Sequence, residues 1–192
     1  MKKTVIKTET EVKGPAIRPL RAFLFIVFAA ALVALDRMSK YWVLAHDGLR
    51  SGESIEIIPG FFNLSYTFNT GAAWSLLADK SWGIYVLTAI SAVAAIAFLI
   101  LLIRRSGWPF IIPFTISLIL AGTVGNLIDR LFLHGVVDFL DFYYGSRHFP
   151  TFNLADSLIV VGIILLLLLM IFYEPKFKER YAVEQKHKVR PI

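Results

Sequence analysis

The stretch GNLIDRLFLHGVVDFLDFYYGSRHFPTFNLADS, residues 125–157, is a polar interruption between two long apolar runs. It holds four of the fourteen acidic residues of the chain, namely Asp129, Asp138, Asp141 and Asp156. An ionised side chain costs roughly 2.5–3.5 kcal/mol at the centre of a bilayer on insertion scales, so acids beside membrane spans usually have a function. Two carboxylates that lie close together can also divide the roles of acid and base. We therefore expect the rest of the chain to hold these acids in place.

Composition indicates a membrane protein. Of the 192 residues, 57% are hydrophobic and 18% are charged, whereas a soluble domain is nearer half apolar and about a quarter charged. The apolar runs long enough to cross a bilayer as helices cover about 19–42, 82–103, 108–128 and 157–173. The first run alone also fits the core of a secretory signal peptide. Its long polar lead and the helical pattern that continues through residues 36–40 favour a span instead.

Charge predicts the orientation of these spans. Fourteen of the twenty Lys and Arg residues fall on one side if the chain crosses the membrane four times. The positive-inside rule assigns that side to the cytoplasm, so we expect basic cytoplasmic tails at 1–18 and 174–192 around one membrane domain at 19–173. Nucleic acid is not an expected partner, because the basic residues form no groove interleaved with aromatic stacking residues. The chain has no cysteine, and hence no thiol nucleophile or cysteine metal ligand.

The segment between the first two runs carries a β pattern. A short strand is predicted over Ser54–Ile58, and strict alternation predicts a second, half-buried strand over 62–68. One face of that strand would carry Phe62, Leu64, Tyr66 and Phe68. Residues 72–78 are predicted to form a short interfacial helix anchored by Trp74. The expected fold class is an all-α membrane protein with four transmembrane helices, a small extracytoplasmic β-structure and this short helix.

Asp138 and Asp156 are the leading catalytic candidates. Neighbouring carboxylates resist double ionisation, so one can stay protonated while the other takes a proton from water. Peptide hydrolysis without a metal needs both roles, because water must be activated and the leaving amine protonated. The residue pattern alone leaves open that each aspartate caps a helix or pairs with a base, and Asn153 can itself cap the fourth helix.

Further polar residues recur at helical spacing near the same membrane face. Asn126, Asp129 and Arg130 share one face of the third helix. Arg130 can pair with Asp129, or with Asp36 across the bundle. Asp36 and Lys40 are spaced for an intrahelical ion pair on the first helix. A buried polar network that fixes helix packing is the alternative to a functional site for Asn126, Asp129 and Arg130. For Asp36 and Lys40 the alternative is a simple intrahelical ion pair.

Other catalytic classes lack their motifs in this sequence. It has no HExxH pair for a zinc metalloprotease and no GxSxG around a serine. The histidines are scattered at His46, His134, His148 and His187. We expect no metal and no cofactor. A transporter would place polar groups near mid-membrane, whereas these spans are apolar at their centres; a non-enzymatic scaffold or a proton-coupled carrier is the competing hypothesis.

Five short blocks in a fixed order resemble those of the lipoprotein signal peptidase (signal peptidase II) family, the intramembrane aspartic proteases of bacteria. The blocks are DRMSK at 36–40, NTGAAWS at 69–75, GNLIDR at 125–130, VVDF at 136–139 and FNLADS at 152–157. Each block alone is a weak pattern, but together and between four spans they are specific. The departures are Arg37 where the family often has Gln, Trp74 where Phe is common, and a longer basic lead.

The resemblance implies a four-helix membrane core with a β-cradle and an interfacial helix on the outer side. It also implies that Asp138 and Asp156 are the catalytic dyad of an enzyme that cleaves diacylglyceryl-modified prolipoproteins just before the lipidated cysteine. Residues around the substrate or in support of the dyad would be Asp36, Lys40, Asn69, Gly71, Asn126, Asp129, Arg130, Asn153 and Ala155. The implied partners are these substrates, membrane lipid and globomycin-type inhibitors. The implied place is the bacterial cytoplasmic (inner) membrane, with the site near the outer face. As a separate hypothesis, residues 69–80 close over the site as a lid.

Overall fold

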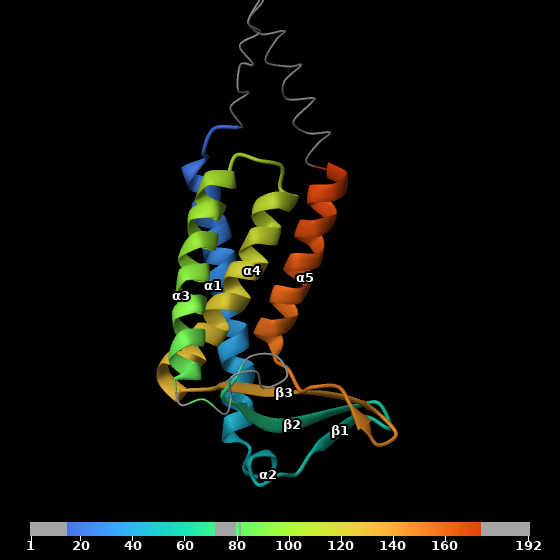
Figure 1. Ribbon diagram of the computed structural model, residues 1–192. Helices are drawn as coiled ribbons and strands as arrows, with labels where there is room; N and C mark the ends of the chain where they lie inside the picture. The colour runs from blue at the N-terminus through green and yellow to red at the C-terminus, as the bar shows by residue number, and fades with distance from the viewer. Residues whose placement is uncertain (1–14, 72–79, 81, 174–192) are drawn as a thin grey trace, which may run out of the picture.

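A computed structural model of the chain describes residues 15–71, 80 and 82–173. Four long helices run side by side, and a small antiparallel sheet lies across one end of them (Figure 1). We call this the sheet end. The described chain begins and finishes at the opposite end, which we call the terminal end (Figure 1). The predicted fold class is confirmed in its four helices and its small sheet, whereas the predicted helix at 72–78 falls outside the described residues.

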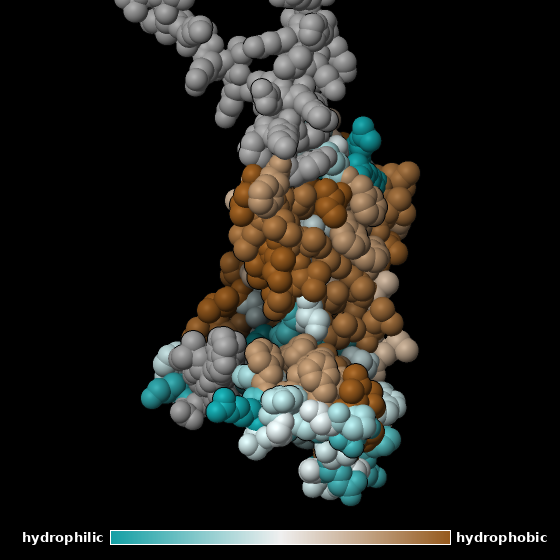
Figure 2. Space-filling view, turned by 90° about the vertical axis from the view of Figure 1, so that its right-hand side faces the viewer, coloured by the Kyte–Doolittle hydropathy of each residue, from teal (hydrophilic) through white to brown (hydrophobic). Residues whose placement is uncertain are grey.

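The four helices have the length and composition needed to cross a membrane. They are α1 (Pro19–Ala45), α3 (Gly83–Arg105), α4 (Ile111–Leu133) and α5 (Leu154–Leu168), and α5 continues as a π-helical turn, η2 (Leu169–Tyr173). Pro19 begins α1, where its missing N–H costs no hydrogen bond. Figure 2 shows a largely apolar helical surface that gives way to polar residues at the sheet end.

Helix α4 is the centre of the bundle. It packs against α1, α3 and α5, and most of its side chains are buried. The other three helices turn large apolar side chains such as Phe23, Val93 and Ile164 outward, as expected for helices that face lipid. The polar residues at the sheet end of α4 are therefore shielded by the surrounding helices.

Small residues allow α4 and α5 to approach closely. A Cβ added to Gly122 would lie 2.2 Å from the carbonyl oxygen of Ala155, and one added to Gly162 would lie 2.5 Å from Ile119. A Cβ on Gly125 would lie 2.6 Å from a carboxylate oxygen of Asp36. Membrane helices commonly use small residues in this way. The contact brings the start of α5 against the polar face of α4.

The sheet is built from two hairpins in the order β1-β2-β3-β4. Its strands are β1 (Ile55–Ile58), β2 (Phe62–Asn69), β3 (Val136–Tyr144) and β4 (Arg147–His148), and a short helix α2 (Asp47–Arg50) joins α1 to β1. The strands predicted over 54–58 and 62–68 are thus present. No strand is predicted from the sequence over β3, although the β-branched and aromatic residues of β3 are typical of one.

A β-bulge in β2 changes which side chains share a face. Leu64 pairs with Leu140 and Thr67 with Asp138, so β2 advances three residues while β3 advances two. Residues beyond the bulge therefore change face. Strict alternation predicts Phe68 on the face of Leu64, and this is wrong, because the bulge places Asn69 there instead. Phe68 is 42% exposed, and its ring packs over Gly135, where a Cβ would lie 2.5 Å from the ring.

Candidate active site

Asn153 joins Asp138 of β3 to Asp156 of α5. Its side-chain amide donates to Asp138 Oδ1 over 2.7 Å. Its carbonyl oxygen accepts from the backbone N–H of Asp156 over 2.9 Å, and its own backbone N–H donates to Asp156 Oδ2 over 3.2 Å. The last two bonds form a capping box at the start of α5. Helix capping by Asn153 and contact with Asp138 therefore occur together, so the alternative that Asn153 caps the fourth helix is confirmed.

The backbone holds the start of α5 against β3. The N–H groups of Phe139 and Leu140 donate to the carbonyl oxygen of Phe152 over 3.0 and 2.8 Å, and the N–H of Phe152 donates to the carbonyl oxygen of Leu140 over 3.2 Å. The residue that follows this bridge is Asn153. Asp138 and the cap of α5 are thus fixed by main-chain contacts and do not rely on side-chain bonds alone.

Asn126 of α4 contacts Asp156 from the other side. Its Nδ2 donates to Asp156 Oδ1 over 2.7 Å. Its Oδ1 accepts from Lys40 Nζ over 3.0 Å and from Asn153 Nδ2 over 3.2 Å. An ammonium group can only donate, so Lys40 fixes which end of the Asn126 amide faces it. The amide of Asn126 must then present its donor to the carboxylate.

Asn69 completes the hydrogen bonding of Asp138. Its Nδ2 donates to Asp138 Oδ2 over 3.1 Å, and its Oδ1 accepts from the backbone N–H of Gly71 over 2.9 Å. The bulge in β2 is what puts Asn69 on the face of Asp138. Both carboxylate oxygens of Asp138 therefore receive an amide donor, one from β2 and one from Asn153.

A buried group of charges lies beneath the aspartates. Lys40 Nζ is 2.9 Å from Asp36 Oδ2 and 3.0 Å from Asp129 Oδ2, and all three side chains are fully buried. The expected ion pair between Asp36 and Lys40 is thus confirmed. Arg37 also pairs with Asp129. Two carboxylates therefore face two cations, which lowers the cost of burying them.

The same carboxylates hold other elements in place. Asp36 Oδ1 accepts from the backbone N–H of Ala155 in α5 over 2.9 Å. Asp129 Oδ2 accepts from the backbone N–H of Val137 in β3 over 3.2 Å. Each charge thus anchors a residue adjacent to Asp156 or to Asp138. The alternative of a polar network that fixes packing describes Asp129 correctly, and Asp36 has the same role. The packing that they fix is that of the two candidate catalytic residues.

Arg130 is not paired as the sequence suggests. The predicted pairing of Arg130 with Asp129 or Asp36 is wrong. The carboxylate of Asp129 instead pairs with Arg37 and Lys40. The carboxylate of Asp36 contacts Lys40 and the backbone N–H of Ala155. Arg130 Nη1 instead donates to Ser91 Oγ of α3 over 3.3 Å. Its buried Nε has no hydrogen-bond partner within the described part of the chain. Its charge still acts on Asp138 and Asp156.

The surroundings of Asp138 make it a weaker acid than an ordinary aspartic acid. Burial raises the pKa of Asp138 most, and the negative charge of Asp156 raises it further, to about 6. The amide donors of Asn69 and Asn153 and the charge of Lys40 oppose this rise. A carboxyl group whose pKa lies nearer neutral is suited to general acid–base work.

The two histidines of the second outer loop lie away from this site. His148 of β4 contacts Asp141 through Nδ1 over 2.8 Å and stacks on Tyr143. Asp141 is three residues from Asp138 on β3, so its side chain lies on the opposite face of the sheet. His134 ends α4 in the left-handed conformation, with φ of 60°. Among the described residues, no three His, Asp or Glu side chains are grouped to hold a metal.

Comparison with known proteins matches this arrangement to one family. Residues 28–172 match the family described as Signal peptidase (SPase) II. The chain belongs to the signal peptidase II family. A lipoprotein signal peptidase of Yersinia pseudotuberculosis serotype O:1b (strain IP 31758) is 45% identical over 141 residues, which cover 72% of this chain and 81% of the relative. One of Yersinia pestis (strain Pestoides F) is 46% identical over 136 residues, covering 70% and 78%.

Solved structures agree with the assignment to signal peptidase II. One bacterial membrane enzyme is 31% identical with a TM-score of 0.69 over 83% of this chain and 92% of that one. A second is 33% identical with a TM-score of 0.68 over 78% and 94%. As a member of the signal peptidase II family, the chain is a peptidase, and its four apolar helices are those of a multi-pass membrane protein of the bacterial inner membrane.

The sequence alone does not reveal every residue of this signal peptidase II site. Arg37 stands out in the sequence only as a departure from the family pattern, yet it pairs with Asp129. Its place next to Asp36 on a helix that carries buried charges is the signal that could have found it. Gly122 and Gly125 are small residues on α4, of the kind that lets membrane helices approach closely.

Proposed function

We propose that this protein is an aspartic endopeptidase that removes the signal peptide from diacylglyceryl-modified prolipoproteins by cutting just before the lipidated cysteine. One observation carries the proposal: Asn153 holds Asp138 and Asp156 together, at one end of four apolar helices. The names of the relatives from Yersinia, lipoprotein signal peptidase, supply the substrate class.

The two aspartates would act as one unit that holds a single proton. The ionised member takes a proton from water, and the resulting hydroxide attacks the scissile carbonyl. The protonated member then gives its proton to the leaving nitrogen. Support comes from the raised pKa of Asp138, which the nearby charge of Asp156 helps to cause. The proton belongs to the pair, and we assign it to neither residue alone.

Neighbouring groups would place the substrate and the water. Arg130 is half-buried beside both aspartates, and its buried Nε makes no hydrogen bond within the described residues. We propose that Arg130 binds the substrate backbone. Asn69 and Gly71 form a turn beside Asp138, and this turn would give the substrate backbone a second set of contacts. Globomycin-type inhibitors would occupy the same place.

The membrane would fix the depth of the substrate. We propose that the sheet end faces outward and that both termini are cytoplasmic, because fourteen of the twenty Lys and Arg residues then lie inside. The signal peptide would lie along the helices, with its diacylglyceryl group in the lipid and its scissile bond at the aspartates. Such pre-positioning lowers the entropic cost of the reaction.

The test is cleavage of a diacylglyceryl prolipoprotein by purified protein in detergent. Asp138→Asn and Asp156→Asn should each lower turnover by roughly 10²–10⁴-fold, with unchanged folded yield. Asp141→Asn is the matched control, because Asp141 lies on the same strand and pairs with His148; it should retain activity. A scaffold or a proton-coupled carrier would instead lose folded yield in the first two variants. An active Asp138→Asn would contradict the dyad.

A further inference from the structure

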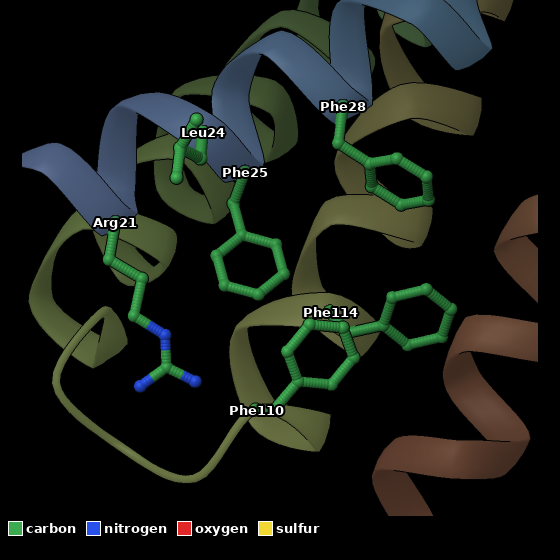
Figure 3. Close-up of a pocket in the computed structure, with 6 residues that line it drawn as sticks. All are labelled: Arg21, Leu24, Phe25, Phe28, Phe110 and Phe114. Atoms are coloured by element: carbon green, nitrogen blue, oxygen red, sulfur yellow. The ribbon is translucent and has the colours of Figure 1, made fainter.

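A cavity lies at the terminal end, far from the aspartates. Its volume is about 390 Å³, within the range of roughly 300–1,000 Å³ typical of ligand sites. Its lining comes from α1 and from the start of α4, and consists of Arg21, Leu24, Phe25, Phe28, Phe110 and Phe114 (Figure 3). Arg21 precedes Asp36 by fifteen residues, or roughly 22 Å of helix. Nothing in the proposed peptidase chemistry uses this cavity.

The walls of the cavity are aromatic and packed together. The ring centroids of Phe25 and Phe110 are 5.4 Å apart, those of Phe28 and Phe114 5.6 Å, and those of Phe110 and Phe114 5.7 Å. Phe25 is buried, whereas Leu24 and Phe110 are exposed on the outer side of the helices. The cavity is therefore an apolar groove between α1 and α4 that opens toward the lipid.

Positive charge stands at the mouth of this groove. Arg21 Nη1 donates to the carbonyl oxygen of Trp108 over 2.8 Å, and the guanidinium carbon of Arg105 lies 4.2 Å from the centroid of the Trp108 ring. Two cations thus lie beside one residue. The segments 15–35 and 83–128, which build the groove and its rim, contain no Asp or Glu. A ligand that combines an apolar chain with an anionic head complements both features.

We infer that this groove binds an anionic glycerophospholipid, with one acyl chain between α1 and α4 and its phosphate on Arg21. A guanidinium carries five N–H donors in a planar fork that suits phosphate oxygens, and the contact with Trp108 is one hydrogen bond. The acyl chain would cover the exposed edges of Phe110 and Phe114. The lipid would come from the leaflet at the terminal end.

Charge disfavours a signal peptide as the occupant. The leading region of a secretory signal peptide is positively charged, and it would lie at the same depth as Arg21 if the apolar region filled the groove. Like charges at that depth repel. The inference concerns a binding site that is separate from the aspartates, so it does not depend on the proposed function.

Native mass spectrometry of the full chain with equal amounts of phosphatidylglycerol and phosphatidylcholine of the same acyl chains tests the inference. The wild type should retain one phosphatidylglycerol with about tenfold preference, as expected for a charge-assisted contact. Arg21→Gln removes the charge and can still donate to Trp108; it should lose that preference. Leu24→Trp fills the groove and should weaken retention of both lipids about tenfold.

Two matched variants separate the groove from a general basic or apolar surface. Arg104→Gln removes a charge from an exposed residue at the same end. Phe23→Trp enlarges an exposed residue beside Leu24. Neither residue lines the groove. Both should bind lipid as the wild type does. Equal retention of the two lipids by the wild type, or equal losses in Arg21→Gln and Arg104→Gln, would overturn the inference. So would displacement of the lipid by a synthetic basic signal peptide from the wild type but not from Leu24→Trp.

Discussion

The carboxylate of Asp36 on α1 accepts a hydrogen bond from the backbone N–H of Ala155, the second residue of α5, over 2.9 Å. The first N–H groups of a helix have no partner within the helix. In α5 one such group is bound by the capping residue Asn153 and another by Asp36 from a different helix. Asp156 follows Ala155 directly, so α1 fixes the position of a candidate catalytic residue without touching it.

Replacing Asp36 should therefore weaken both the fold and the activity. In Asp36→Ala, the N–H of Ala155 loses its acceptor and Lys40 loses one of its two carboxylates. We expect the free energy of unfolding to fall by about 3–5 kcal/mol, as for other broken buried pairs. Chemical denaturation in detergent measures it. Asp47→Ala is the control, because Asp47 pairs with Arg50 at the exposed surface and should unfold at the wild-type denaturant concentration.

The contact between α4 and α5 should not tolerate a larger residue at 155. The Cβ that would be added at Gly125 lies 3.1 Å from the Cβ of Ala155, so this place is filled. Ala155→Val should lower the free energy of unfolding by about 1–3 kcal/mol and reduce cleavage by moving Asp156. Ala89→Val makes the same change at an exposed position of α3. Similar stability and turnover in the two variants would contradict the role of the small residues.

Asn69 should set the pH at which Asp138 ionises. The amide donor of Asn69 favours the ionised form and so holds down a pKa that is raised to about 6. In Asn69→Ala the carboxylate of Asp138 loses this donor, so the pKa of Asp138 should rise further. The bend that Asp138 causes in the plot of kcat/KM against pH should then move to higher pH. Asn63→Ala changes the same strand at the register position of Asp141 and should keep the wild-type profile. A bend that stays in place in Asn69→Ala would count against this contact.

The same carboxyl group should make stability depend on pH. The pKa of Asp138 is about 6 in the folded protein and about 3.9 in an unfolded chain, so the folded state holds this proton more tightly. Stability from Asp138 is then fully present below about pH 4 and is lost as pH rises through about 6, a full decline of about 3 kcal/mol. Thermal unfolding from pH 4 to 7 measures it.

Variants separate this decline from the titration of other groups. Asp138→Asn cannot ionise at residue 138, so its unfolding temperature should fall less over the same range than that of the wild type. Asp141→Asn leaves Asp138 intact and should show the wild-type decline. If the unfolding temperatures of the wild type and Asp138→Asn fall in parallel as pH rises, ionisation of the buried Asp138 does not lower the stability of the fold.

The sequence predicts the features of this fold that depend on short-range patterns. Apolar length predicts the helices, and spacing of four residues predicts the ion pair of Asp36 and Lys40. The position of Asn153 three residues before Asp156 predicts its capping bond. Each of these features joins residues of one helix or its immediate start, where geometry follows from the period of the helix.

Features that join distant segments could not be predicted in this way. Arg130 is next to Asp129 on α4, yet Arg37 from α1 takes that carboxylate, because the choice depends on how two helices pack. The bulge in β2 could not be predicted for the same reason. Only its pairing with β3 reveals the extra residue, and the sequence of β2 by itself alternates without a break.

The bulge gives β2 one residue that its pairing with β3 does not need. Removing a residue between Leu64 and Thr67 would leave Thr67 opposite Asp138 and Asn69 opposite Val136, so Asn69 would stay on the face of Asp138. Removing Phe68 would instead turn Asn69 to the other face of the sheet and take away one of the two amide donors of Asp138. In evolution, β2 should therefore accept a change of length at its bulge and reject one between Thr67 and Asn69.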